Sequence, residues 1–379
     1  MNINLVTPLG YTGYGMAGLN ILKALIRLGH NVALFPIGTP NPDSQEDVEA
    51  IQLASKNTAN FDPHALCIRI WHQFDMAQRV GTGRFVGFPI FELDTLKPNE
   101  IHHLSTLDEI AVTSEWAKSV LENNGIHKPI KVCPLGVDRN IFRPLGEPES
   151  TKSLRTKPGN MVFLNMGKWE VRKGHDILAK IFMDTFSQTD AVELWMCPHN
   201  PFLKQQEIDG FMRNYHSRPG QIKVLERLKS SKNVAEVMNT ADVGIFPSRA
   251  EGWNMEALEM LACSKHIIIT ECSAHTEYCN HENSHLVMVP DVEPAVDKKW
   301  FFGDGNWAKI DDAAIEQISR YMRELYDRFH FHGLSRNIAG LETAQKLTWE
   351  NTAKKLLEVT PEYSGVSGYI KYEEPALNR

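Results

Sequence analysis

Short apolar runs alternate with stretches of helical spacing along the first part of the chain. Residues 2–7 form an apolar run that predicts a strand, and a glycine-containing loop follows at 8–15. Residues 16–28 repeat Leu and Ile at helical spacing, and a second strand is expected at 31–35. This order predicts a βαβ unit, and therefore a parallel sheet. Further strands are expected at 66–71, 85–91, 109–112 and 130–133, and a helix at 114–124.

The same alternation starts again after residue 160. Pro, Ser, Lys and Gly are concentrated in residues 146–160, which indicates a linker. Strands are then expected at 161–165, 192–196, 222–225, 241–246 and 267–270, and helices at 174–185, 207–215 and 253–263. We therefore predict an α/β protein with two successive domains, residues 1–150 and 151–345, and a cleft between them.

Composition and charge narrow the class of protein. The chain has 379 residues, with 40 Lys and Arg against 47 Asp and Glu, and this net charge of −7 does not favour a broad nucleic-acid surface. The six cysteines form no CxxC pair, so we expect free thiols in a reducing compartment, the cytoplasm. The fifteen histidines show no metal-binding spacing, and we expect no metal. We also expect neither a signal peptide nor a transmembrane segment.

The most informative stretch is 246–259, where a predicted strand passes into a predicted helix. Pro247 and Gly252 interrupt the chain between them, which places Glu251 at the start of the helix and Glu259 eight residues later, roughly 12 Å along it. Such a spacing suits the sugar and the ribose of a nucleotide-sugar, because carboxylates bind hydroxyl groups well. Free amides after the glycine suit an anionic group. The alternative is that the helix dipole favours the first glutamate and that the second lies on a solvated face.

The whole string, Phe-Pro-Ser-Arg-Ala-Glu-Gly-Trp-Asn-Met-Glu-Ala-Leu-Glu, resembles the donor-site signature of family 4 glycosyltransferases, the group 1 type. The resemblance implies the GT-B fold, in which two Rossmann-like domains face each other across a cleft and the second holds most of the donor. It also implies that Gly252, Trp253, Asn254 and Met255 lie at the donor together with both glutamates. Residues 133–144 resemble the turn that closes the first domain of this family.

Two stretches extend the resemblance toward the C-terminus. Residues 300–311 resemble a late loop before the last helices. Residues 347–356, Leu-Thr-Trp-Glu-Asn-Thr-Ala-Lys-Lys-Leu, resemble the terminal helix of the family, which crosses back onto the first domain. Residues 346–379 are therefore expected to form a C-terminal helix and a tail that pack on the N-terminal domain.

A basic loop opens the second domain. Residues 166–174, Met-Gly-Lys-Trp-Glu-Val-Arg-Lys-Gly, resemble the Gly-Arg…Lys-Gly loop whose two cations bind the donor diphosphate in this family. By position Lys168 replaces the arginine, without its bidentate fork, and Lys173 corresponds to the lysine. Arg172 is a second candidate for the missing guanidinium. The alternative is that three cations lie solvated on a loop.

The first domain offers further candidates. Its opening glycines follow G-x-x-G-x-G rather than the dinucleotide pattern, which argues against NAD. Gly13 and Gly15 predict either a close approach to a phosphate or sugar, or only a tight turn. Family members often carry a histidine in this domain that touches the donor sugar, but the comparable run here contains none. Glu92, Asp94 or His72 is a candidate for that role, and each is equally a candidate structural residue.

The resemblance implies a retaining glycosyltransferase that moves a sugar from a nucleotide-diphosphate-sugar to an acceptor hydroxyl, with no metal and no other cofactor. The absence of an Asp-x-Asp motif in the sequence agrees with this. The acceptor is open among saccharides, lipids, proteins and modified nucleic acids, and the oligomeric state is open too. Two alternatives remain: another GT-B chemistry, such as a nucleotide-sugar epimerase or a phosphorylase, and a non-catalytic module that binds a nucleotide or glycan.

Overall fold

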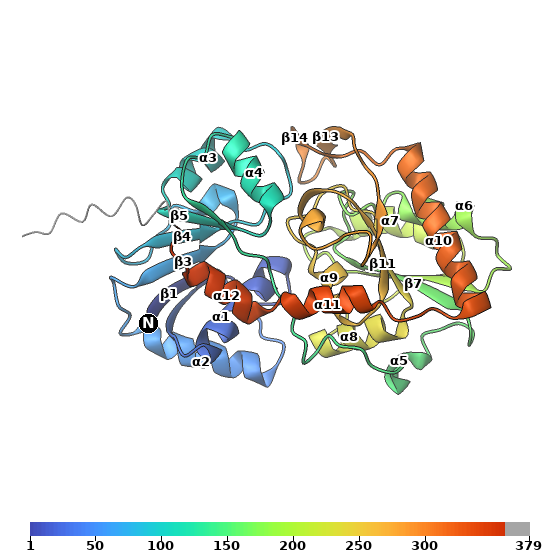
Figure 1. The fold of residues 1–379 in the computed structure, drawn as a ribbon, viewed down its shortest axis with the longest axis horizontal. Helices are drawn as coiled ribbons and strands as arrows, with labels where there is room; N and C mark the ends of the chain where they lie inside the picture. Colours follow the sequence, from blue (N-terminus) through green and yellow to red (C-terminus); the bar gives the residue numbers. More distant parts are fainter. Residues whose placement is uncertain (361–379) are drawn as a thin grey trace, which may run out of the picture.

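The computed structural model describes residues 1–360 and shows two lobes, each built on a six-stranded parallel sheet (Figure 1). The first sheet has the strand order β2-β1-β3-β4-β5-β6. Its strands are β1 Asn2–Thr7, β2 Asn31–Pro36, β3 Leu66–Ile70, β4 Phe85–Phe88, β5 Glu109–Val112 and β6 Ile130–Val132. The helices of this lobe are α1 Gly13–Arg27, α2 Gln45–Thr58, the 3-10 helix η1 Gln73–Asp75, α3 Pro98–Ser105 and α4 Glu115–Asn123.

The second sheet has the strand order β12-β11-β10-β7-β8-β9. Its strands are β7 Met161–Gly167, β8 Val192–Pro198, β9 Ile222–Val224, β10 Val243–Phe246, β11 His266–Thr270 and β12 His285–Val287. The helices are α5 Glu149–Lys152, α6 Leu178–Thr185, α7 Gln205–Tyr215, α8 Ser231–Thr240, α9 Met255–Ala262, the 3-10 helix η2 Ser273–Glu277 and α10 Asp312–His332. The predicted fold class, two α/β domains, is confirmed.

The sheets are apolar on both faces because helices cover them on two sides. Every residue of β3 and β8 is buried, which is typical of central strands in a parallel sheet. In the second sheet β7 and β10 are parallel neighbours, with Phe163 paired to Val243. The loops that follow these two strands therefore leave the same edge of the sheet, where ligands bind in open α/β folds.

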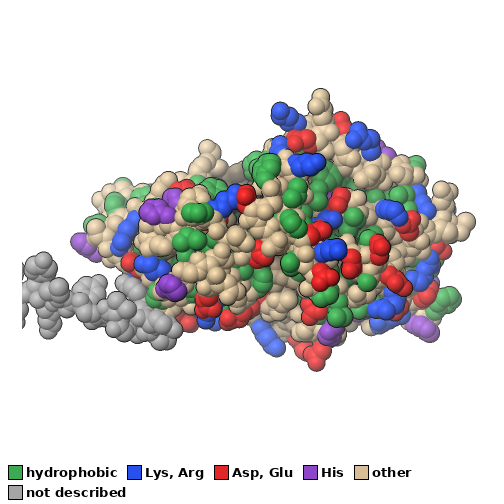
Figure 2. All heavy atoms as spheres, turned by 90° about the horizontal axis from the view of Figure 1, so that it is seen from above, with side chains coloured by type: hydrophobic (Ala, Val, Ile, Leu, Met, Phe, Trp, Pro, Cys, Tyr) green, Lys and Arg blue, Asp and Glu red, His purple; other side chains and the backbone are tan. Residues whose placement is uncertain are grey.

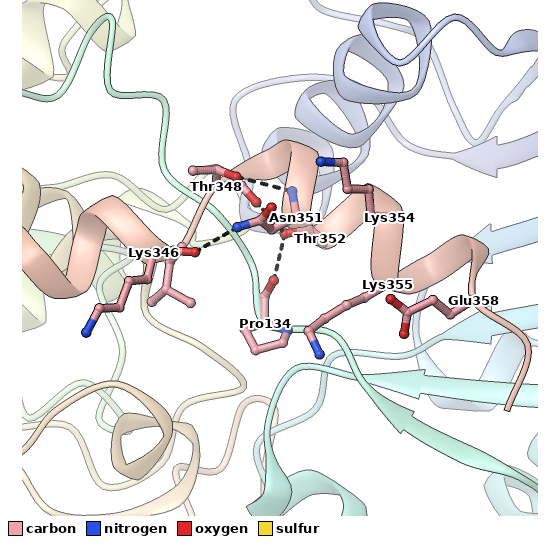
Figure 3. Close-up of a pocket in the computed structure, with 9 residues that line it drawn as sticks. Pro134, Lys346, Thr348, Asn351, Thr352, Lys354, Lys355 and Glu358 are labelled. Atoms are coloured by element: carbon pink, nitrogen blue, oxygen red, sulfur yellow. Dashed lines mark hydrogen bonds between the residues drawn. The ribbon is translucent and has the colours of Figure 1, made fainter. Parts of the chain in front are cut away.

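The last two helices join the lobes, as the terminal-helix resemblance predicted. Helix α11 (Ile338–Lys346) packs on α9 of the second lobe, and α12 (Trp349–Leu357) packs on α1 of the first. At the crossing the hydroxyl of Thr352 donates to the carbonyl of Pro134 at 2.6 Å (Figure 3). Residues 361–379, the remainder of the predicted tail, lie outside the described residues.

Residues 300–311 are not the loop that was expected. Strand β14 (Phe302–Ala308) pairs antiparallel with β13 (Val292–Val296) and forms a hairpin beside the cleft. The sequence of β14 does not show the alternation typical of a strand, because it contains two glycines and its first half is exposed. The segment is extended because it pairs with β13. The expected linker 146–160 likewise contains the short helix α5.

Two features bear on the expected location. None of the helices in residues 1–360 is both long and apolar enough to cross a membrane. All six cysteines are free thiols, and five of them are buried.

Candidate active site

The loop that carries Glu251 runs from the end of β10 into α9. Helix α9 begins at Met255 and is capped by Asn254, whose side-chain oxygen accepts a hydrogen bond from the amide of Ala257 at 3.2 Å. Glu251 therefore lies in the loop before the helix, and the helical rise in the spacing argument does not apply to it. The helix-dipole alternative is also wrong for Glu251, because the acidic residue in the first turn is Glu256.

The carboxylate of Glu251 is buried and is held by two cations. Nη1 of Arg172 donates to one oxygen at 2.7 Å, and Nζ of Lys173 donates to the other at 2.9 Å. The hydroxyl of Ser248 donates to the same oxygen as the lysine, also at 2.9 Å. Burial alone would raise the pKa of Glu251, but the charges of Arg172 and Lys173 outweigh it and hold this pKa well below its usual range. Glu251 is therefore ionised although water is excluded from it.

The loop after β7 supplies both cations. Arg172 also donates to Glu170 through Nε at 3.0 Å and Nη2 at 2.7 Å, and to the carbonyl of Ala250 at 2.6 Å. Because Arg172 and Lys173 are buried, the alternative of solvated cations is wrong for these two. The side chain of Lys168 is 41% exposed and contacts Glu170 at 2.9 Å, so Lys168 is open to a ligand. We call the following residues the buried charge cluster: Glu170, Arg172, Lys173 and Glu251.

Two buried histidines fix the shape of these loops. Nε2 of His175 lies 2.8 Å from Oδ1 of Asn165, and burial lowers the pKa of His175 to about 3. Nδ1 of His275 lies 2.8 Å from the carbonyl of Thr270 and its Nε2 lies 2.9 Å from Nδ2 of Asn254. Burial lowers the pKa of His275 to about 4. A neutral ring that donates through Nδ1 and accepts at Nε2 satisfies both contacts of His275.

The first domain packs directly on the loop after β10. The carbonyl of Gly252 accepts a hydrogen bond from Oγ1 of Thr113 at 2.5 Å. A methyl group on Gly252 would lie 2.6 Å from Cγ2 of Ile90, so the two domains meet too closely here for a side chain. Trp253 is 2% exposed, its ring contacts Tyr278, and its indole N–H has no partner among residues 1–360. The candidate site therefore lies at the junction of the two domains.

Glu259 lies in the middle of α9 in a different setting. The residue is half-buried, and its carboxylate makes no hydrogen bond within the part of the chain that the structure describes. Burial, and after it the charge of Glu256, raise the pKa of Glu259 well above its usual value. Met255, at the start of the same helix, is half-buried too. The Glu259 carboxylate is thus available to hydroxyl groups of a ligand.

The two predicted glycines of the first domain lie in a helix rather than in a loop. Helix α1 begins at Gly13, three residues before its expected start. A Cβ on Gly15 would lie 2.7 Å from the amide nitrogen of Gly10, so Gly15 lets α1 pack on the preceding loop. The space around Gly13 is open.

The three candidates for the family histidine lie at different distances from the charge cluster. Oε1 of Glu92 is 4.0 Å from Nη2 of Arg172, and burial raises the pKa of Glu92. Asp94 instead accepts hydrogen bonds from the backbone and side-chain nitrogens of Asn306, at 2.8 and 3.0 Å. His72 packs among aromatic rings, and its pKa is lowered to about 4 by burial and then by Lys168. Asp94 thus serves the contact between β14 and the first domain.

Residues 160–299 match the family model described as Glycosyl transferases group 1. This part of the second domain is therefore similar to the group 1 glycosyltransferases. The matched range contains the buried charge cluster and the whole of α9, so both parts of the candidate site that come from this domain lie inside it.

Curated relatives of this chain include two proteins named D-inositol 3-phosphate glycosyltransferase. The protein from Arthrobacter sp. (strain FB24) is 25% identical over 247 residues, 65% of this chain and 53% of the relative. The protein from Rhodococcus erythropolis (strain PR4 / NBRC 100887) is 22% identical over 255 residues, 66% of this chain and 52% of the relative. The chain spans about half the length of these relatives.

Solved glycosyltransferase structures match nearly the whole chain. Sucrose-phosphate synthase from Thermosynechococcus elongatus superimposes with a TM-score of 0.69 at 15% identity, and covers 97% of this chain and 100% of its own. Anabaena Alr3699/HepE in complex with UDP-glucose gives 0.68 at 14% identity, over 94% and 98%. The fold is therefore GT-B.

Sequence reasoning missed four residues of this candidate site: Glu170, Ser248, His175 and His275. The alternating charges of Lys-Trp-Glu-Val-Arg-Lys are a local signal that Glu170 pairs with its basic neighbours. No local signal joins Arg172 to Glu251, which lies 79 positions later. Within residues 1–360, no group of three or more His, Cys, Asp and Glu side chains is arranged to hold a metal ion.

Proposed function

We propose that this chain is a retaining glycosyltransferase that transfers a sugar from a nucleotide-diphosphate-sugar to an acceptor hydroxyl without a metal ion. The observation that carries the proposal is the buried, ionised Glu251, held by Arg172 and Lys173 where the two domains meet. The family match and the GT-B fold support sugar transfer as the reaction class. The Anabaena structure contains UDP-glucose, which makes this compound the first donor to test.

In the proposed reaction, the bond between the anomeric carbon and the diphosphate oxygen breaks. A bond from that carbon to the acceptor oxygen forms on the same face of the sugar, and the acceptor proton passes to the departing phosphate. Positive charge from Lys168 and Lys173 stabilises the leaving diphosphate. Since Lys173 is bound to Glu251, it shares its charge between the diphosphate and this carboxylate.

The two glutamates have separate roles in the proposal. The carboxylate of Glu251 accepts hydrogen bonds from hydroxyl groups of the donor sugar, because an ionised acceptor gives the stronger bond. The carboxylate of Glu259, which lacks a partner among the described residues, accepts from the ribose.

The test uses the full chain, a panel of nucleotide-sugars and a mixture of acceptors, with excess EDTA in half of the reactions. We expect nucleoside diphosphate to be released at the same rate with and without EDTA, and NMR to show the anomeric configuration of the donor in the product. Activity that EDTA abolishes and Mn²⁺ or Mg²⁺ restores would contradict the metal-free site. An inverted product would contradict retention.

The same reactions separate the alternatives. An epimerase turns over the donor when no acceptor is present, and a phosphorylase requires inorganic phosphate. A non-catalytic module gains thermal stability from the nucleotide-sugar but leaves it intact.

A further inference from the structure

A cavity of about 280 Å³ opens between the first domain and the β13–β14 hairpin. One wall comes from η1 and the segment that leads into α3, and the other from the turn of the hairpin. In Figure 1 the hairpin lies at the top of the second lobe, on the side of the first lobe that carries α3 and α4. The lining includes the aromatic side chains of Phe74, Trp300 and Phe302 and the charged side chains of Glu92, Lys97, Glu100 and Asp304.

The hairpin is fixed to both domains, so this wall of the cavity is firmly built. Asp94 binds Asn306 through two hydrogen bonds, and Lys97 contacts Asp304 at 2.7 Å. On the other side Trp307 packs in a small apolar cluster with Ala250, the residue before Glu251. The hairpin therefore connects the cavity to the loop that carries the candidate donor site.

Glu92 places the cavity directly beside the buried charge cluster. It lines the cavity, and its carboxylate lies 4.0 Å from Arg172, which holds Glu251. An occupant of the cavity is thus close to where a donor sugar would bind, on the side of the first domain.

The lining combines aromatic rings with hydrogen-bond acceptors that lack donors. Phe74, Trp300 and Phe302 are 46%, 45% and 67% exposed, although large aromatic side chains are normally covered. The carboxylate of Glu92 makes no hydrogen bond within the described residues, and its side chain is 33% exposed. A sugar ring matches this combination, since it offers an apolar C–H face to a ring and hydroxyl donors to the acceptors.

The charge of the lining selects against anionic ligands. Three carboxylates, those of Glu92, Glu100 and Asp304, face the single ammonium group of Lys97, and Lys97 is already paired with Asp304. A phosphate group would meet net negative charge among these lining residues. Lys168, whose charge reaches Glu92 and His72, is not part of the lining and is assigned to the donor diphosphate in the proposed function. Figure 2, which looks onto this side of the molecule, shows exposed hydrophobic side chains where the lobes meet, with acidic and basic groups beside them.

We propose that this cavity binds the acceptor and that the acceptor is a neutral saccharide unit. The inference rests on the proposed function for its role in transfer, but saccharide binding itself can be measured without a donor.

Saturation-transfer NMR on the full chain, without donor, tests binding of neutral mono- and disaccharides and of their phosphate esters. We expect neutral sugars to bind and the matching esters not to bind. Trp300→Ala and Phe74→Ala should each weaken binding about two- to tenfold, by loss of a stacking surface. Phe331→Ala is the matched control, because this ring is 76% exposed on α10, away from the cavity.

A transfer assay then separates the two proposals. In Trp300→Ala the KM for the acceptor should rise, while hydrolysis of the donor in the absence of acceptor stays at the wild-type rate. If the donor is turned over but only phosphate esters, lipids or proteins accept the sugar, or if Trp300→Ala binds saccharides like the wild type, the inference is wrong and the proposed function stands. If neutral saccharides bind as expected but no nucleotide-sugar is turned over, the proposed function is wrong and the saccharide site stands.

Discussion

Glu251 and Glu259 belong to one short stretch of sequence, but their carboxylates have opposite surroundings. Glu251 pairs with two buried cations, so Glu251→Gln removes the carboxylate that Lys173 is hydrogen-bonded to and leaves Arg172 with Glu170 as its hydrogen-bonded carboxylate. Removing one side of a buried pair costs about 3–5 kcal/mol. We therefore expect a strongly lowered Tm, measured by thermal unfolding. A variant that melts with the wild type would show that the two cations do not depend on this charge.

Glu259→Gln is expected to act in the other direction. Because burial raises the pKa of Glu259, its charged form disfavours the folded state, and a neutral amide of similar shape should keep or raise the Tm. The change also removes a carboxyl group proposed to bind the ribose hydroxyls, a contact worth about 1.5–3 kcal/mol, so affinity for the nucleoside should fall roughly ten- to a hundredfold. Calorimetric titration with nucleoside measures this. Unchanged nucleoside affinity would remove Glu259 from the donor site.

The variant Lys168→Ala tests the proposed contact between Lys168 and the donor diphosphate. Lys168 is partly exposed, and the buried Glu170 keeps its two hydrogen bonds from Arg172, so we expect the Tm to change less than in Glu251→Gln. Affinity for nucleoside diphosphate should fall about tenfold or more, while affinity for nucleoside stays the same. Lys180→Ala, an exposed lysine paired with Asp184 on α6, is the control. Equal weakening of both ligands would place Lys168 elsewhere.

These residues mark the limit of prediction from one sequence. The string around Glu251 and the loop around Lys173 could be found from the order of residues, because each is local. The ion-pair partner of each charged residue could not be predicted. Arg172 and Glu251 come from different loops, which meet only when β7 and β10 pair. The close contact of Gly252 with Ile90, across the domain junction, is hidden for the same reason.

At the scale of elements, the start of α12 depends on a glycine of the first domain. A Cβ on Gly136 would lie 2.2 Å from the amide nitrogen of Trp349, so Gly136→Ala pushes backbone against backbone. Overpacking of this kind costs about 1–3 kcal/mol, and we expect the Tm to fall by several degrees. Gly146→Ala, with nothing within 4 Å of the added carbon, is the control and should melt with the wild type. Equal melting of the two variants would contradict this contact.

Elements with strong local patterns were predicted well. β1 and β5 have the expected bounds, and Ser114 caps α4 by accepting from the amide of Ala117. The hairpin strand β14 was missed, because its extended form depends on β13 and on contacts with the first domain. The start of α9 was placed two residues early, since Asn254 adopts φ 77°, which is uncommon for a residue other than glycine.

At the scale of the whole molecule, buried neutral histidines make stability depend on pH. The pKa of His275 is about 4 in the folded protein and about 6.5 when unfolded. Between these values the unfolded chain binds a proton that the folded protein does not. The stability from a neutral His275 is therefore complete above pH 6.5 and is lost as the pH falls toward 4, on the order of 2 kcal/mol by pH 5.

The variant His275→Gln isolates this effect. Urea unfolding at several pH values should show the stability of the wild type, relative to His275→Gln, decreasing as the pH falls from 7 to 4.5. The buried carboxylates with raised pKa, Glu92 and Glu259, act in the opposite sense in both proteins and cancel in the difference. A difference that stays constant with pH would show that His275 is not kept neutral by folding.

The crossing of α12 has a mechanical consequence. The chain leaves the first domain through residues 134–137 and returns at 347–352, and these two passages touch, with the amide of Val137 donating to the carbonyl of Leu347 at 3.1 Å. Two domains that are joined by two adjacent chain segments can rotate about the line through those segments, but they cannot separate along it. The two passages therefore form a hinge between the domains. Opening at the opposite edge must break the contacts of Asp94 with Asn306 and of Lys97 with Asp304, and also the hydrogen bond from Thr113 to Gly252.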